Sequence, residues 1–123
     1  MRIFIVSAAV ILLMPSAGAG TSVIHKRGTM ECDLTEATPL VYQGKLYRFE
    51  YVRDNYKHNP AGKACFRLVD LATQETTAPF ALGYHLGSAY VEGGRIYVYG
   101  VITWGAESID VFWSDDLKTW QQQ

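Results

Sequence analysis

Hydrophobic and polar positions alternate with a period of two along most of the chain beyond residue 30. The clearest case is residues 45–53, where Tyr47, Phe49 and Tyr51 share one face and Leu46, Arg48, Glu50 and Val52 share the other. This period is typical of a β-strand with one buried face. After residue 19, no segment has the 3.6-residue apolar period of an amphipathic helix. The pattern therefore predicts an all-β fold.

Turn-forming residues divide the alternating segments into two similar groups. The predicted strands of the first group are 37–42, 45–53, 64–71 and a short outer strand at 78–82, and those of the second are 87–92, 95–103 and 108–113. A tight hairpin joins the first two strands of each group, at Gln43-Gly44 and at Gly93-Gly94. After Trp120 we expect no further ordered element.

The two groups are copies of each other. Gly44-Lys45-Leu46-Tyr47 returns as Gly94-Arg95-Ile96-Tyr97 at an offset of 50, and a strand with its turn at 66–73 is a weaker copy of one at 112–119, at an offset of 46. A repeat of about 50 residues with three or four short antiparallel strands is the signature of a β-propeller blade. We expect blade one over about residues 30–83 and blade two over about 84–120; a β-sandwich or a barrel is the alternative.

The first residues follow a different pattern. Arg2 precedes an almost wholly apolar run to Met14, and Pro15 to Ala19 supply a break and a small-residue cleavage site. Because a membrane span needs roughly 20 apolar residues, this shorter run predicts a secretory signal peptide over 1–19 rather than a membrane anchor. We expect residues 20–123 to be secreted or periplasmic and to have no membrane attachment after cleavage.

Composition narrows the classes of partner. Beyond the signal peptide, which contains Arg2, ten basic and twelve acidic residues remain, for a net charge of −2. The absence of a polybasic surface argues against a nucleic-acid partner. Eight Tyr and three Trp suit strands and sugar-stacking surfaces alike. Export permits a disulfide between Cys32 and Cys65, and free thiols are the alternative.

The most specific motif closes the chain. Ser114-Asp115-Asp116-Leu117-Lys118-Thr119-Trp120, together with the two Gly-x-x-Tyr hairpins, resembles the blade hallmark of the five-bladed β-propeller glycosidases, the arabinanase, xylosidase and invertase-like superfamily. The resemblance covers about residues 30–120, or two of five blades. An Asp in such a turn accepts backbone N–H bonds, and Leu117 and Trp120 offer apolar area for the seam between blades, so we predict a structural role for the motif. A sialidase-type propeller is a weaker match, because its Asp-box has Gly where Leu117-Lys118 stands here.

The resemblance implies where the chemistry would lie. In that superfamily, acidic residues at the starts of the innermost strands hydrolyse a glycosidic bond, one as general acid and another as base or nucleophile. On this basis Asp33 and Glu36, just before the first inner strand, are the predicted catalytic residues. The family places Asp directly before the Pro that opens this strand, whereas Thr38 precedes Pro39 here. The predicted substrate-binding residues are Glu31, His85, Arg53 and Trp104.

We therefore expect an exported glycosidase-like propeller protein that acts on or binds an oligo- or polysaccharide. Its usual general acid would come from a third blade, so we expect a fragment that is inactive alone and self-associates through an unpaired blade face. A non-catalytic carbohydrate-binding or interaction module is the alternative. No cofactor or metal is predicted, although the carboxylates near Asp33 would allow calcium.

Overall fold

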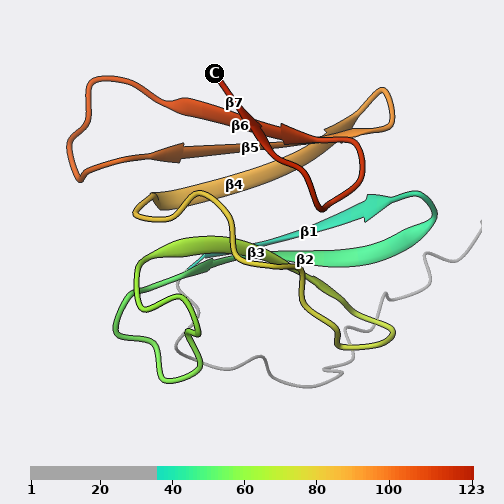
Figure 1. The fold of residues 1–123 in the computed structure, drawn as a ribbon. Helices are drawn as coiled ribbons and strands as arrows, with labels where there is room; N and C mark the ends of the chain where they lie inside the picture. The colour runs from blue at the N-terminus through green and yellow to red at the C-terminus, as the bar shows by residue number, and fades with distance from the viewer. Residues whose placement is uncertain (1–35) are drawn as a thin grey trace, which may run out of the picture.

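The computed structural model describes residues 36–123, which form two antiparallel β-sheets and no helix (Figure 1). The first sheet has the order β1 (Glu36–Tyr42), β2 (Lys45–Val52), β3 (Cys65–Asp70). The second has the order β4 (His85–Glu92), β5 (Arg95–Val101), β6 (Asp110–Ser114), β7 (Gln121–Gln122). The all-β prediction is confirmed. The predicted signal peptide lies outside the described residues.

Six predicted strands are present, with ends that differ by two residues or fewer. The predicted outer strand at 78–82 is wrong, because that segment makes only an isolated bridge between Phe80 and Phe66. Pro79 has no N–H to extend a ladder there. The expectation of no ordered element after Trp120 is also wrong. β7 pairs with β6, and the N–H and C=O of Gln123 bond to Val111 at 2.9 and 3.0 Å.

The two hairpins have the same geometry, but opposite sides of them are buried. Both turn residues of each have positive φ, 48° and 75° at 43–44 and 58° and 81° at 93–94, as in a type I′ turn. Positions 50 apart can therefore be compared directly. Phe49 is buried between the sheets, whereas its equivalent Tyr99 stacks on the exposed Tyr90, and its neighbour Val98 is the buried residue. Phe49 thus points from the first sheet toward the second, and Tyr99 points from the second sheet away from the first. Equivalent side chains therefore point in the same direction. A two-fold axis between the sheets would make them point toward each other, so the sheets are not related by one.

Two glycines let the sheets approach closely. A Cβ on Gly87 of β4 would lie 2.5 Å from Cζ of Phe49, and one on Gly100 of β5 would lie 2.6 Å from Cζ of Phe66. Both rings are completely buried, and Phe66 also makes an edge contact with Phe112 of the second sheet. Aromatic rings of the first sheet therefore fill space that the second sheet leaves free of side chains.

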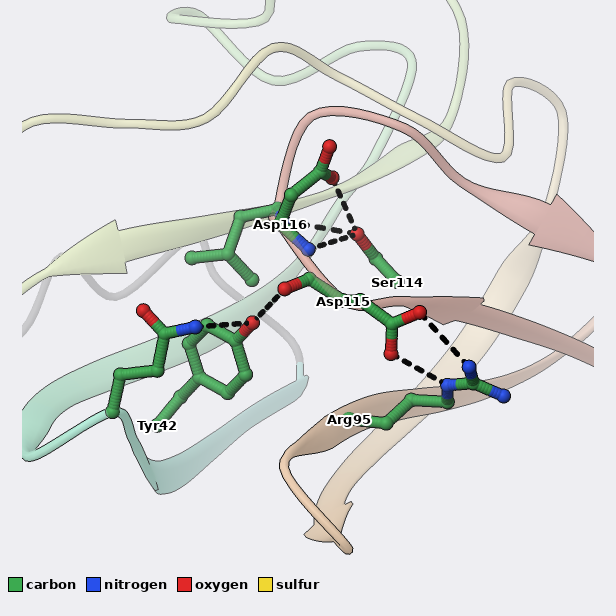
Figure 2. A network of polar contacts seen from close by, with 7 residues as sticks. Tyr42, Arg95, Ser114, Asp115 and Asp116 are labelled. Carbon is green, nitrogen blue, oxygen red and sulfur yellow. Dashed lines mark hydrogen bonds and ion pairs between the residues drawn. The ribbon is translucent and has the colours of Figure 1, made fainter.

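An aspartate organises the turn after β6. Oδ1 of Asp116 accepts N–H bonds from Lys118 and Thr119, both at 2.8 Å. Oγ of Ser114 accepts the N–H of Leu117 at 2.9 Å (Figure 2). The N–H bonds from Thr119 and Lys118 lower the pKa of Asp116 to about 2. Asp70 accepts the same two kinds of bond, from the residues two and three positions later. The repeat at an offset of 46 is thus a repeat of turn chemistry.

The same turn connects the two sheets. The Tyr42 hydroxyl, at the end of β1, donates to the carbonyl of Asp115, whose carboxylate forms a two-point ion pair with Arg95 at 2.7 and 2.9 Å (Figure 2). Trp120 stacks on Phe80 with ring centroids 3.6 Å apart and planes 5° apart. The predicted structural role of the motif is confirmed.

Candidate functional site

The candidate site lies at the end of the sheets opposite the hairpins. Glu36 opens β1 and His85 opens β4, while Arg53 directly follows β2 and Trp104 lies in the loop after β5. β1 and β4 pack against each other and run in the same direction (Figure 1). The strand starts, and the ends of their hairpin partners, therefore meet at one end of the molecule. The predicted residues Asp33 and Glu31 lie outside the described residues.

A chain of ring contacts crosses from one sheet to the other at this end. The Tyr51 hydroxyl lies 2.8 Å from Nδ1 of His85, and the His85 ring lies 6.3 Å from the Trp104 ring at an angle of 40°. Tyr51 is only 4% exposed, whereas Trp104 is 71% exposed. The buried hydroxyl therefore fixes the orientation of an imidazole whose other neighbour is a solvent-facing indole.

Glu36 is the Cα partner of Tyr51 across the β1–β2 ladder. Burial raises the pKa of the Glu36 carboxyl, and the backbone N–H of Gly87 opposes part of that rise. Its Oε2 atom is buried and has no hydrogen-bond partner among residues 36–123. Buried carboxylate oxygens are normally hydrogen-bonded, so this oxygen can accept a bond from a ligand hydroxyl, or the carboxyl can hold a proton.

The charges around Tyr51 come from both sides of the β2 terminus. Burial raises the pKa of Tyr51, the negative charges of Glu36 and Asp54 raise it further, and the positive charge of Arg53 lowers it. The structure thus gathers Glu36, His85, Arg53 and Trp104, all four predicted residues in the described part, around one tyrosine.

Tyr51 and Asp54 are site residues that were not predicted from the sequence. The available signal was position: Tyr51 is the last aromatic residue on the inward face of β2, and Asp54 follows Arg53 at the same strand end. Nothing local distinguishes Tyr51 from Tyr47, which packs against the same core from the other end of the strand.

Two hollows formed by the described residues lie away from this end. One of about 480 Å³ opens beside the Asp70 and Asp116 turns, and one of about 310 Å³ lies on the outer face of the first sheet. Each of the two aspartates already accepts two backbone N–H bonds, so the first hollow offers a ligand little free acceptor capacity.

Two further properties concern residues 36–123 alone. Their His, Cys, Asp and Glu side chains form no group of three that could hold a metal ion. They also contain no helix of the length and apolar character needed to cross a membrane. Cys65 is a buried free thiol whose pKa is raised by burial, and Cys32 lies outside the described part.

Comparison of the chain with models of known protein families, with curated proteins and with solved structures finds no match in any of the three. The geometry of the described residues is therefore the basis for the functional proposal.

Proposed function

We propose that this protein binds an oligo- or polysaccharide at the strand-start end, on two sheets that are consecutive β-propeller blades. The blade assignment is supported by the direction of equivalent side chains. Positions 50 residues apart point the same way through the stack, as successive blades around a propeller axis require, whereas a two-fold sandwich would bury both. The parallel course of β1 and β4 supports the same arrangement (Figure 1).

One observation carries the binding proposal: the buried Tyr51 hydroxyl holds His85 beside the exposed Trp104, next to a buried oxygen of Glu36 that has no partner in the described part of the chain. Sugars are recognised by an aromatic ring against their C–H face and by a few fixed polar groups around their hydroxyls. Trp104 supplies the ring. His85 and Glu36 supply a positioned imidazole and a free acceptor.

Hydrolysis is a narrower proposal about the same residues. A carboxyl with a raised pKa suits the general acid of a glycosidase, since it stays protonated nearer neutral pH. Glycoside hydrolysis also needs a second carboxylate at a defined separation. The sequence predicts Asp33 for that role, and Asp54 is the carboxylate that the structure adds to this end. We therefore propose binding as the primary function, with Glu36 as the acid if turnover occurs.

The binding test is titration of the purified protein with a panel of neutral pentose and hexose oligosaccharides, followed by tryptophan fluorescence and calorimetry. Trp104→Ala should weaken binding at least tenfold. Trp113→Phe is the control and should bind normally, because Trp113 lies in β6, outside the loop that contains Trp104, and packs under Arg95. Absence of binding across the panel, or equal loss in both variants, would contradict the proposal.

The catalytic role has a separate test. Glu36→Gln and Asp33→Asn are assayed for hydrolysis of aryl glycosides, with oligosaccharide binding measured in parallel. Lost turnover with retained binding supports the acid assignment for Glu36. Unchanged turnover in both variants would remove both residues from the mechanism.

A further inference from the structure

The outer face of the second sheet is a row of aromatic side chains, which we name the tyrosine face: Tyr90, Tyr97, Tyr99 and Trp113. Tyr90 stacks between its neighbours, 5.1 Å from Tyr97 and 5.7 Å from Tyr99, with ring planes within 14°. The Tyr99 hydroxyl bonds to the Tyr90 hydroxyl at 3.3 Å, and Tyr90 is 38% exposed. Because the rings stack on one another, they present edges and hydroxyls outward and offer no broad flat platform for a sugar ring.

The outer face of the first sheet has a different character. Glu50 is fully buried between Arg48 and Arg67, whose Nε atoms lie 2.6 and 2.7 Å from its two carboxylate oxygens. These three residues form what we name the arginine face. It borders the hollow of about 310 Å³, which Tyr56 and His58 also line. Two guanidinium groups against one carboxylate leave an excess of positive charge, and the two arginine side chains keep 19% and 14% exposure.

The direction of stacking relates these two faces. The first sheet presents Phe49 and its neighbours to the second, and the equivalent side of the second sheet carries Tyr99 and its neighbours. A further sheet could stack on the second sheet in the same direction. The side of it that is equivalent to the arginine face would then contact the tyrosine face. The inner contact joins Phe rings to glycine backbone, whereas a contact between these two outer faces would join hydroxyl-tipped rings to guanidinium groups.

We propose that a second copy of this chain docks its arginine face onto the tyrosine face of the first, in a head-to-tail contact. Guanidinium groups bind aromatic rings and donate to hydroxyl oxygens, and Arg and Tyr are enriched in protein interfaces. The molecule already makes this kind of contact internally. Arg95 lies 4.1 Å over the Trp113 ring, and Arg67 lies 5.9 Å from the centroid of Tyr56.

A head-to-tail contact is heterologous, so a pair of copies keeps one free face of each kind and assembly continues to a ring or a chain. Two other occupants of the tyrosine face predict different behaviour. Tyrosine face against tyrosine face would give a closed dimer in which the arginine face has no part. A different protein as the occupant would leave this chain monomeric.

The experiment measures mass by light scattering over a concentration series, with two variants and their mixture. Tyr97→Ser with Tyr99→Ser disables the tyrosine face. Glu50→Gln with Arg48→Gln and Arg67→Gln disables the arginine face while removing all three charges together, which avoids an unpaired buried carboxylate. Circular dichroism and melting confirm folding. Leu82→Ser is the control, since Leu82 is 54% exposed in the segment between β3 and β4 and is not part of either face.

The wild type and the control should show a mass above that of one chain. Each disabled variant should associate at least tenfold more weakly, and an equimolar mixture of the two should form a heterodimer that grows no further, because one intact face of each kind remains. A monomeric wild type, or loss of association in the tyrosine variant alone with no heterodimer, would overturn the proposal. Carbohydrate titration is independent of this result, because Trp104 and Glu36 lie on neither face.

Discussion

The two ends of the stacked sheets each contain a carboxylate and a tryptophan, but these residues make contacts within the protein to very different extents. At the hairpin end, Asp116 accepts two backbone N–H bonds and Trp120 stacks on Phe80. At the strand-start end, Glu36 has a buried oxygen to which no described residue bonds, and Trp104 is exposed. At the hairpin end, the carboxylate and the tryptophan make their contacts within the protein. At the strand-start end, a different carboxylate and a different tryptophan remain available to a ligand.

From this difference we expect the hairpin end to contribute mainly to stability and the strand-start end mainly to function. The hairpin end connects both sheets through Tyr42, Asp115 and Arg95 (Figure 2), so it holds the stack independently of the other end. Proteins generally depart from local rules of hydrogen bonding and burial at functional sites, where stability elsewhere compensates. The comparison therefore predicts that substitutions at the two ends will have different consequences.

The largest expected difference is between the two tryptophans. Trp120→Ala should destabilise the fold by about 2–4 kcal/mol, because it removes the stacked ring over Phe80. Trp104→Ala should change stability by less than about 0.5 kcal/mol, as exposed substitutions usually do, while weakening oligosaccharide binding. Urea denaturation of both variants measures this difference. Equal destabilisation by the two would contradict the separation of the ends.

A smaller effect is expected at the buried serine of the turn. Ser114→Ala should cost about 1–2 kcal/mol, because the N–H of Leu117 loses its acceptor and Ser114 is only 1% exposed. Ser88→Ala is the matched control in β4, where the serine is exposed, and should cost less than about 0.5 kcal/mol. If the two variants unfold at the same urea concentration, the hydroxyl of Ser114 does not hold the turn.

The smallest effects should appear in the pH dependence of melting, with opposite signs at the two ends. The raised pKa of Glu36 means that its contribution to stability is complete below the unfolded value near 4.5 and is lost as the pH rises through the folded value. The contribution of Asp116 is complete above its unfolded value of 3.8 and is lost as the pH falls through about 2.

Melting temperatures between about pH 2 and 7 check both signs. Relative to wild type, Glu36→Gln should gain stability as the pH rises above the ordinary glutamate range. The deficit of Asp116→Asn should shrink as the pH falls below about 4. A deficit of Glu36→Gln that grows with pH would show that the folded protein stabilises the ionised carboxylate of Glu36.

Several features of the fold were predictable because they depend on neighbours in the sequence. The period of two located β2 and β5 within two residues, and the Gln-Gly and Gly-Gly pairs located both hairpins. β7 was not predicted, because two glutamines carry no strand pattern. They form a strand only where the turn led by Asp116 returns the chain alongside β6.

The candidate site was predicted as separate positions. Strand starts and ends suggested Glu36, His85, Arg53 and Trp104 under the family resemblance, and the structure places all four at one end. The residue that connects them, Tyr51, was not identified. Its partner His85 is 34 positions away, and their contact exists only because the two sheets stack.

The sequence by itself determined the strands, the hairpins and the aspartate turns, because each depends on periodicity or on hydrogen bonds spanning a few residues. Only the tertiary structure decided which face of each sheet is buried, which tryptophan is exposed and which carboxyl lacks a partner. Gly87 and Gly100 show the physical reason: their value lies in the missing Cβ atoms that admit Phe49 and Phe66 from the other sheet. Whether that space is filled depends on side chains of the other sheet, which lie far away in the sequence.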